Sequence, residues 1–142
     1  MKMKRFLINI IFLLITLSSH GQFTDLVMIG NDTGFKSTTK VNAKAIFRGK
    51  YSSWRNGESV TIVLPSTKSE NVISIASQVY NMTVKGMQKY WLEQVFQGRS
   101  NAPVFLEDDE GIINYVKRNP GSVAFVKSGK AVPQALIIQI TE

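Results

Sequence analysis

Short apolar runs alternate with helical segments along this sequence, and that alternation most limits the folds open to the chain. Strand-like runs are predicted at 25–30, 59–64, 122–126 and 136–140, with a shorter extended piece at 104–105. Helices are predicted between them at 42–48, from a cap at Ser69 to Tyr80, at 84–96, and from Asp108 or Asp109 to Arg118. Strands that alternate with helices in 142 residues predict one α/β domain, a small mixed sheet flanked by helices.

For the first strand and the first helix, the sequence also predicts burial and end points. The run 25–30 is almost continuously apolar, which is typical of a strand buried on both faces, as in a parallel sheet. Residues 36–39 are polar and are interpreted as a loop. In the helix that follows, Val41, Ala45 and Ile46 are expected to face inward, and Gly49 is expected to end it.

The helix at 84–96 has a strong apolar pattern. Thr83 is expected to cap it, and Gly98 to stop it. Its apolar side is predicted to be formed by Met87, Tyr90, Trp91, Val95 and Phe96. Together with Trp54, the aromatic members of this set suggest either a stacking platform or, as helical spacing favours, a buried core.

The N-terminal segment has the layout of a secretory signal. Residues 1–5 are basic, 6–17 are apolar, and Ser19 and Gly21 are small residues where a signal peptidase reads the chain. The alternative is a membrane anchor, but a spanning helix needs roughly 20 apolar residues and this run is shorter. We therefore expect residues 1–21 to be a signal peptide cleaved after Gly21, and 22–142 to be the mature domain of an exported protein.

Composition excludes several kinds of chemistry. The chain has no cysteine, and its single histidine is His20, inside the predicted signal. The mature domain would then lack the commonest zinc ligands and the commonest general base, so no cofactor, metal or enzymatic activity is expected. Without the three basic residues of the signal, 14 basic and 10 acidic side chains leave a net charge of +4. These charges are scattered, which disfavours nucleic-acid binding.

Three motifs occur in an order typical of one protein family. They are Ile46-Phe47 and Gly49-Lys50 followed by Trp54 and Asn56-Gly57; Tyr90-Trp91 with Phe96 and Gly98; and Asn119-Pro120-Gly121 leading into the strand at 122–126. Together they resemble the phosphate-binding-protein-like domains, which are relatives of the periplasmic substrate-binding proteins of phosphate ABC transporters. The chain is most similar to short, single-lobe members of that family.

The resemblance implies one lobe of a type II periplasmic-binding-protein fold. It also implies a periplasmic location and capture of a phosphate-like oxyanion for a membrane transporter. Phosphate binders of this kind place a Ser-Gly-Thr turn, with an Arg and an Asp nearby, just after a strand. Here the equivalent position is occupied by Pro65, Ser66, Thr67, Lys68 and Ser69. The hydroxyl groups are retained, whereas the Gly, Arg and Asp are not.

The turn of Ser66, Thr67, Lys68 and Ser69 is the leading candidate for an anion site. Hydroxyl groups, an ammonium group and the N-terminus of the next helix all supply hydrogen-bond donors or positive charge. The alternative is an ordinary helix cap beside a solvated lysine.

A second turn follows the first strand and contains Asn31 and Thr33. Because ligands of open α/β sheets sit beyond the carboxyl ends of strands, this turn is expected to face the same crevice as Ser66 to Ser69. The alternative is a plain surface turn. The acidic run 107–110 suggests a calcium site, but it lacks the ligand spacing of a calcium loop and is better explained as an acidic helix start.

Three functions remain open from the sequence. The first is a non-enzymatic exported protein that captures a small oxyanion such as phosphate. The second is an interaction module that has lost ligand binding and serves as an adaptor for an envelope protein or as half of a homodimer. The third, a hydrolase with a Ser66–Lys68 pair, is disfavoured by the missing Cys and His. An apolar crevice would favour the second function, and a crevice lined by hydroxyls and Lys68 the first.

Overall fold

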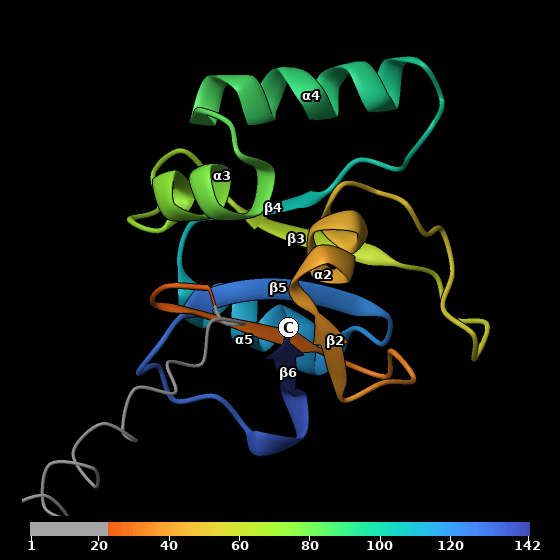
Figure 1. Ribbon diagram of the computed structural model, residues 1–142, viewed down its shortest axis with the longest axis vertical. Helices are drawn as coiled ribbons and strands as arrows, with labels where there is room; N and C mark the ends of the chain where they lie inside the picture. The colour runs from red at the N-terminus through yellow and green to blue at the C-terminus, as the bar shows by residue number, and fades with distance from the viewer. Residues whose placement is uncertain (1–22) are drawn as a thin grey trace, which may run out of the picture.

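The computed structural model describes residues 23–142, and the predicted signal peptide and cleavage site lie outside this range. Figure 1 shows a sheet through the middle of the molecule with helices on both sides. Within residues 23–142, no helix is both long and apolar enough to cross a membrane.

Six strands and four helices make up the regular structure of this range. In chain order they are β1 (Leu26–Gly30), β2 (Ser37–Thr39), α2 (Lys40–Phe47), β3 (Thr61–Pro65), α3 (Val72–Tyr80), α4 (Val84–Phe96), β4 (Val104–Leu106), α5 (Asp109–Arg118), β5 (Ser122–Lys127) and β6 (Ile137–Thr141), with a 3₁₀ turn at Gln134–Leu136. The strands form one sheet in the order β2-β6-β1-β5-β3-β4. The predicted mixed α/β sheet is therefore confirmed.

Strand direction changes at β1. This strand runs antiparallel to both neighbours, β5 and β6, whereas β3 runs parallel to β5 and to β4. Gly30 at the end of β1 lies beside Val123, which also pairs with Ile62 near the start of β3. The end of β1 and the end of β3 consequently lie at opposite ends of the sheet. The expectation of parallel neighbours for residues 25–30 is wrong, although Ile29 and Met28 are buried on opposite faces as predicted.

Each face of the sheet has its own apolar core. On one face, α5 contributes Ile112, Ile113 and Val116, which pack with strand residues such as Val63. On the other face lie α2, α3 and the larger core. Helix α4 forms a further layer because it packs mainly on α3 rather than on the strands, as its position at the top of Figure 1 shows.

Strand β2 corrects the predicted loop at 36–39. It pairs parallel with β6, so that Thr38 lies beside Ile140 and is buried. Thr39 then caps α2, accepting a hydrogen bond from the Asn42 N–H. The three residues of β2 are polar and show no strand pattern in the sequence. They form a strand because they pair with β6, which is distant in sequence.

The inward faces of two helices also differ from expectation. In α2, Ala43, Ile46 and Phe47 are buried while Val41 is 80% exposed. In α4, Met87 and Trp91 are buried as predicted. Val95 and Phe96, by contrast, are exposed, together with Leu92. Two of the five residues predicted for the apolar side of α4 therefore face away from the core.

Two of the three predicted helix caps are confirmed. Thr83 caps α4 and Asp108 caps α5, each side chain accepting a hydrogen bond from a glycine N–H three residues on. The predicted cap at Ser69 is wrong, since α3 begins only at Val72. The Ser69 hydroxyl instead accepts a hydrogen bond from the Asn71 N–H within the preceding turn.

The C-terminus of α2 is held by three side chains from the α3–α4 half of the molecule. Tyr80 donates to the carbonyl of Phe47, Tyr90 to that of Arg48, and Ser100 to that of Gly49. The Tyr80 hydroxyl also accepts a hydrogen bond from the indole of Trp91, at 3.1 Å. The last carbonyls of a helix have no partner within it, so this arrangement both satisfies them and ties α2 to the next two helices.

Candidate functional site

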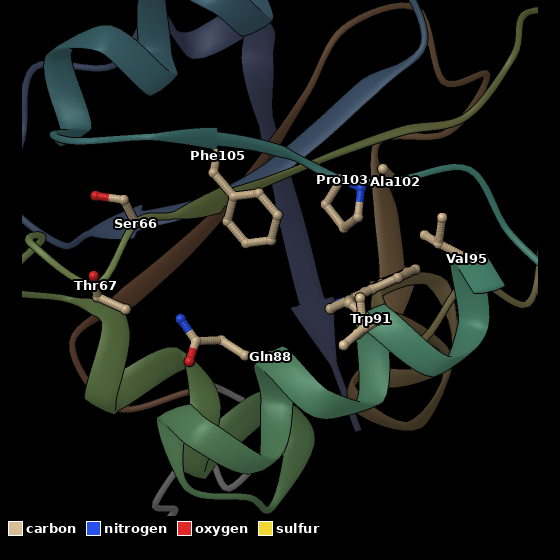
Figure 2. A pocket seen from close by; sticks show the side chains of 9 residues that line it. Ser66, Thr67, Gln88, Trp91, Val95, Ala102, Pro103 and Phe105 are labelled. Atoms are coloured by element: carbon tan, nitrogen blue, oxygen red, sulfur yellow. The ribbon is translucent and has the colours of Figure 1, made fainter.

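A crevice of about 530 Å³ opens between the turn after β3, helix α4 and strand β4. Nine residues line it, and Figure 2 shows how their side chains surround the space: Ser66, Thr67, Gln88, Trp91, Leu92, Val95, Ala102, Pro103 and Phe105. The local structure explains its position. Because α4 rests on α3, it stands away from the edge strand β4 and leaves room between them.

The two ends of the crevice differ in chemistry. Ser66, Thr67 and Gln88 lie toward one end in Figure 2, while Trp91, Val95 and Pro103 lie toward the other, with Phe105 between them. The Ser66 hydroxyl oxygen accepts a 3.4 Å hydrogen bond from the Lys68 N–H, so its own hydrogen is available for a ligand. None of the nine lining residues is ionisable. The crevice can therefore offer hydrogen bonds at one end and apolar contact along the rest.

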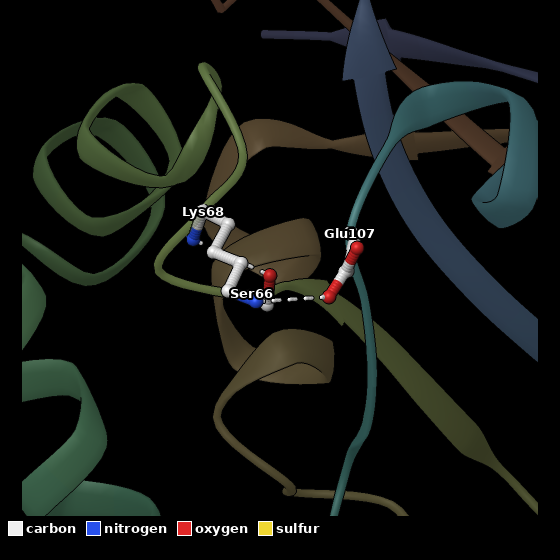
Figure 3. A network of polar contacts seen from close by, with 3 residues as sticks. All are labelled: Ser66, Lys68 and Glu107. Atoms are coloured by element: carbon white, nitrogen blue, oxygen red, sulfur yellow. Dashed lines mark hydrogen bonds and ion pairs between the residues drawn. The ribbon is translucent and has the colours of Figure 1, made fainter.

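Lys68 and Ser69 belong to a different depression on the other side of the turn. The Lys68 ammonium group lies 3.5 Å from the Glu107 carboxylate, and Figure 3 shows this ion pair beside Ser66. Both side chains are largely exposed, so the pair is screened by solvent. The depression is lined by further acidic residues, among them Glu70 and Glu110, which make it unattractive to an anion.

The buried floor of that depression is a closed polar network. Asn71 donates hydrogen bonds to both oxygens of Asp109, and Asp109 also accepts one from the backbone N–H of Lys127. Asp109 is only 5% exposed. Among residues 23–142, no cluster of three or more acidic or histidine side chains is arranged to hold a metal ion. The run 107–110 begins α5 through the Asp108 cap, as the helix interpretation predicts.

Asn31 and Thr33 lie at the far end of the sheet. The Asn31 amide donates to the carbonyls of Val116 and Lys117 in α5, and the Thr33 hydroxyl donates to the carbonyl of Phe35. The expectation that these residues share a crevice with Ser66 is wrong, because β1 is antiparallel to β5 and its carboxyl end points the other way. A role for them in anion binding stays a prediction, separate from the crevice.

Of the six predicted ligand residues, only Ser66 and Thr67 line the crevice. Sequence reasoning missed the wall made by Gln88, Leu92 and the segment 102–105. The sequence held one signal of this wall. Leu92 places an apolar side chain on the polar side of α4, next to Glu93, where a helix that packs only against the core would carry a polar residue.

Trp91 separates the crevice from a smaller polar hollow of about 120 Å³. Arg99, Ser100 and Asn101 line that hollow from the loop after α4. The loop can approach α2 only because Gly49 has no side chain: a Cβ there would lie 2.6 Å from the Ser100 hydroxyl oxygen. Gly49 also has φ +83°, a backbone conformation that favours glycine.

The two residues with shifted pKa values, Tyr80 and Tyr90, do not line the crevice. Burial raises the pKa of the Tyr80 hydroxyl far above its ordinary value and also raises the pKa of Tyr90. Both groups stay neutral and act as hydrogen-bond donors to α2. This arrangement supports the wall of the crevice at Trp91 and offers no acid or base to a reaction.

Comparisons with known proteins identify the fold. No family model matches the sequence, and no curated protein matches it. Among solved structures, the chain is similar to PstS from Borrelia burgdorferi, with a TM-score of 0.61 at 15% identity, over 82% of this chain and 47% of that one. It is also similar to an ABC-type phosphate transport receptor from Vibrio cholerae, with a TM-score of 0.52 at 12% identity, over 82% of this chain and 46% of that one.

The chain spans about half the length of these receptors, which corresponds to a single lobe. The matched part of this chain contains its six-stranded mixed sheet with helices on both faces. The chain thus has a phosphate-binding-protein-like fold.

Proposed function

We propose that this protein is a non-enzymatic, exported binding protein that captures a small oxyanion at the Ser66–Thr67 end of the crevice. The observation that carries the proposal is the position of these two hydroxyl-bearing residues, directly after β3 in a fold shared with phosphate transport receptors. The hydroxyl groups of Ser66 and Thr67 and the amide of Gln88 supply donors of the kind that an oxyanion needs. Handover to a membrane transporter, in the periplasm, extends the proposal by analogy with those receptors.

The electrostatics limit how such a site works. No cation lines the crevice, and Lys68 is engaged with Glu107 on the other side of the turn. Binding must therefore rest on neutral hydrogen bonds, which are weaker than charge-assisted ones. We expect modest affinity that depends little on salt.

Calorimetric titration of the purified 22–142 domain with phosphate, and then sulfate, tests this proposal. Saturable binding that is lost in the double variant Ser66→Ala, Thr67→Val is the expected result. Ser77→Ala removes an exposed hydroxyl of α3 outside the crevice and serves as the matched control. A folded wild-type domain that gives no binding heat with either anion would overturn the proposal.

A second candidate function, half of a homodimer, is favoured by one observation. Exposed Leu92, Phe96 and Phe105 lie on α4 and β4, around or next to a crevice with a mostly apolar lining. Apolar side chains gathered in this way often mark a protein interface. Sedimentation velocity of the 22–142 domain over a range of concentrations tests this function. A dimer that dissociates in Phe96→Asp supports it, and a monomer at all concentrations rules it out.

A further inference from the structure

The crevice is much larger than an inorganic oxyanion. A water molecule occupies about 30 Å³ in the liquid. The volume of about 530 Å³ therefore corresponds to many water-sized spaces, of which a tetrahedral oxyanion fills only a few. Volumes of this order are typical of sites for small organic molecules, which are lined mainly by apolar and aromatic groups with a few polar ones.

The walls of the crevice match such a molecule. Trp91 lines the crevice from α4 although it is only 3% exposed, and Phe105 lines it from β4. Leu92, Val95 and Pro103 complete the apolar part, and the polar side chains of Ser66, Thr67 and Gln88 are confined to one end. A ligand with one polar head and an apolar body would satisfy both parts at once.

The wall is also held rigid where the body of the ligand would rest. The Trp91 indole donates to the Tyr80 hydroxyl, which in turn donates to the Phe47 carbonyl. This chain of hydrogen bonds fixes the ring before any ligand arrives. A fixed apolar surface lowers the entropic cost of binding.

We propose that the ligand of this crevice is an organic molecule with an aromatic or branched apolar body joined to a small hydrogen-bond-accepting head. The head lies at Ser66 and Thr67, and the body lies between Trp91 and Phe105. This inference rests on the proposed function for the location of the site, and it changes the class of ligand from inorganic anion to amphipathic organic compound.

Three probes separate the two proposals: inorganic phosphate as the head alone, phenylphosphonate as head and body, and benzyl alcohol as a neutral head with the same body. Binding is followed by NMR, using the indole N–H signals of the two tryptophans. Trp91 lines the crevice, whereas Trp54 is buried elsewhere with its N–H bonded to the Gly121 carbonyl, so Trp54 is an internal control. We expect phenylphosphonate to shift the Trp91 signal alone and to bind at least about tenfold more tightly than phosphate.

Leu92→Asp places a carboxylate at the apolar part of the crevice. Leu92 is 65% exposed, so the fold should tolerate the change. Ile73→Asp is the matched control, because Ile73 is 71% exposed on α3 and lies outside the crevice. We expect Leu92→Asp to abolish phenylphosphonate binding and Ile73→Asp to preserve it.

The outcomes fall into distinct classes. Equal affinity for phosphate and phenylphosphonate, unchanged in Leu92→Asp, overturns the inference and leaves the oxyanion proposal standing. A Trp91 shift with benzyl alcohol, without binding of either phosphorus probe, supports the apolar body and overturns the oxyanion head. No Trp91 shift with any probe at millimolar concentration overturns the inference.

Discussion

Three side-chain hydroxyl groups that bind the C-terminal end of α2 show how single residues connect this helix to α3, α4 and the loop after α4. Tyr80, Tyr90 and Ser100 donate to three successive carbonyls, and each comes from a different later segment of the chain. Tyr80 is fully buried, so its hydroxyl is stable there only in the neutral form.

The raised pKa of Tyr80 leads to a prediction about alkaline pH. Burial is the main cause of the shift, and Tyr90 shifts in the same direction. In the unfolded chain a tyrosine loses its proton near pH 10. The folded state keeps that proton at higher pH, so the contribution of these tyrosines to the free energy of unfolding should be constant below about pH 10 and fall above it.

Urea denaturation at pH 8, 10 and 11 measures this dependence. Tyr80→Phe removes the ionisable group, so its loss of stability above pH 10 should be smaller than that of the wild type. At pH 8 the same variant should be less stable by about 1–3 kcal/mol, because the Trp91 indole and the Phe47 carbonyl lose their partner. An unchanged pH dependence in Tyr80→Phe would contradict this account.

Substitutions at Gly49 and Gly57 can separate two costs of adding a side chain: backbone strain at positive φ and steric contact of the new Cβ with its neighbours. Both have positive φ, but an added Cβ would meet Ser100 and Trp91 at Gly49 and nothing within 4 Å at Gly57. Gly57→Ala should cost about 1–2 kcal/mol from backbone conformation alone. Gly49→Ala should cost more, and Ser100→Gly in the same chain should recover part of the difference. Chemical denaturation of the three variants provides the comparison, and equal losses at the two glycines would show that the contact with Ser100 is unimportant.

At the scale of elements, α4 is a helix whose start is fixed by a side-chain cap. It packs on α3 and forms one wall of the crevice, and at its start the Thr83 hydroxyl oxygen accepts a hydrogen bond from the Gly86 N–H. Thr83→Ala should lower stability by about 0.5–2 kcal/mol, whereas Thr83→Ser, which keeps the hydroxyl, should lower it less.

Hydrogen exchange locates that effect. The amides of α4 should lose protection in Thr83→Ala before those of β1 and β5, because the central strands open only with the whole molecule. Loss of protection spread evenly over the sheet would show that α4 does not open by itself.

The elements also show what sequence patterns can predict. The bounds of α4 were predictable to the residue, because Thr83 and Gly98 are local start and stop signals. Strand β2 was not, because its three polar residues become a strand only through pairing with β6, about a hundred residues later. The apolar wall of the crevice was missed for a similar reason: Leu92 and Phe105 come together only when α4 is seated on α3.

At the scale of the whole molecule, Gly121 joins three distant segments. Its carbonyl accepts hydrogen bonds from the Trp54 indole and the Thr61 N–H, and its own N–H donates to the Asn31 carbonyl. A Cβ here would lie 2.2 Å from the backbone oxygen of Ser59, and φ is +86°. No flexible side chain can move aside to relieve that contact.

Gly121→Ala should therefore destabilise the entire fold by more than about 3 kcal/mol. Gly129→Ala is the control, since Gly129 has a similar φ of +85° and open space around it. Circular dichroism and urea denaturation compare the two variants. A Gly121→Ala variant as stable as the control would mean that the Ser59 segment shifts freely.

The placement of β1 between β5 and β6 has a consequence for the time at which the protein can fold. Residues 26–30 pair with residues 123–127 and 137–138, so the first strand finds neither neighbour until nearly all of the chain is available. During synthesis β1 must wait while more than ninety residues follow it, and contacts of such long range slow folding. Because β1 lies inside the sheet and both of its neighbours come from the last part of the sequence, its two edges stay unpaired until late in synthesis.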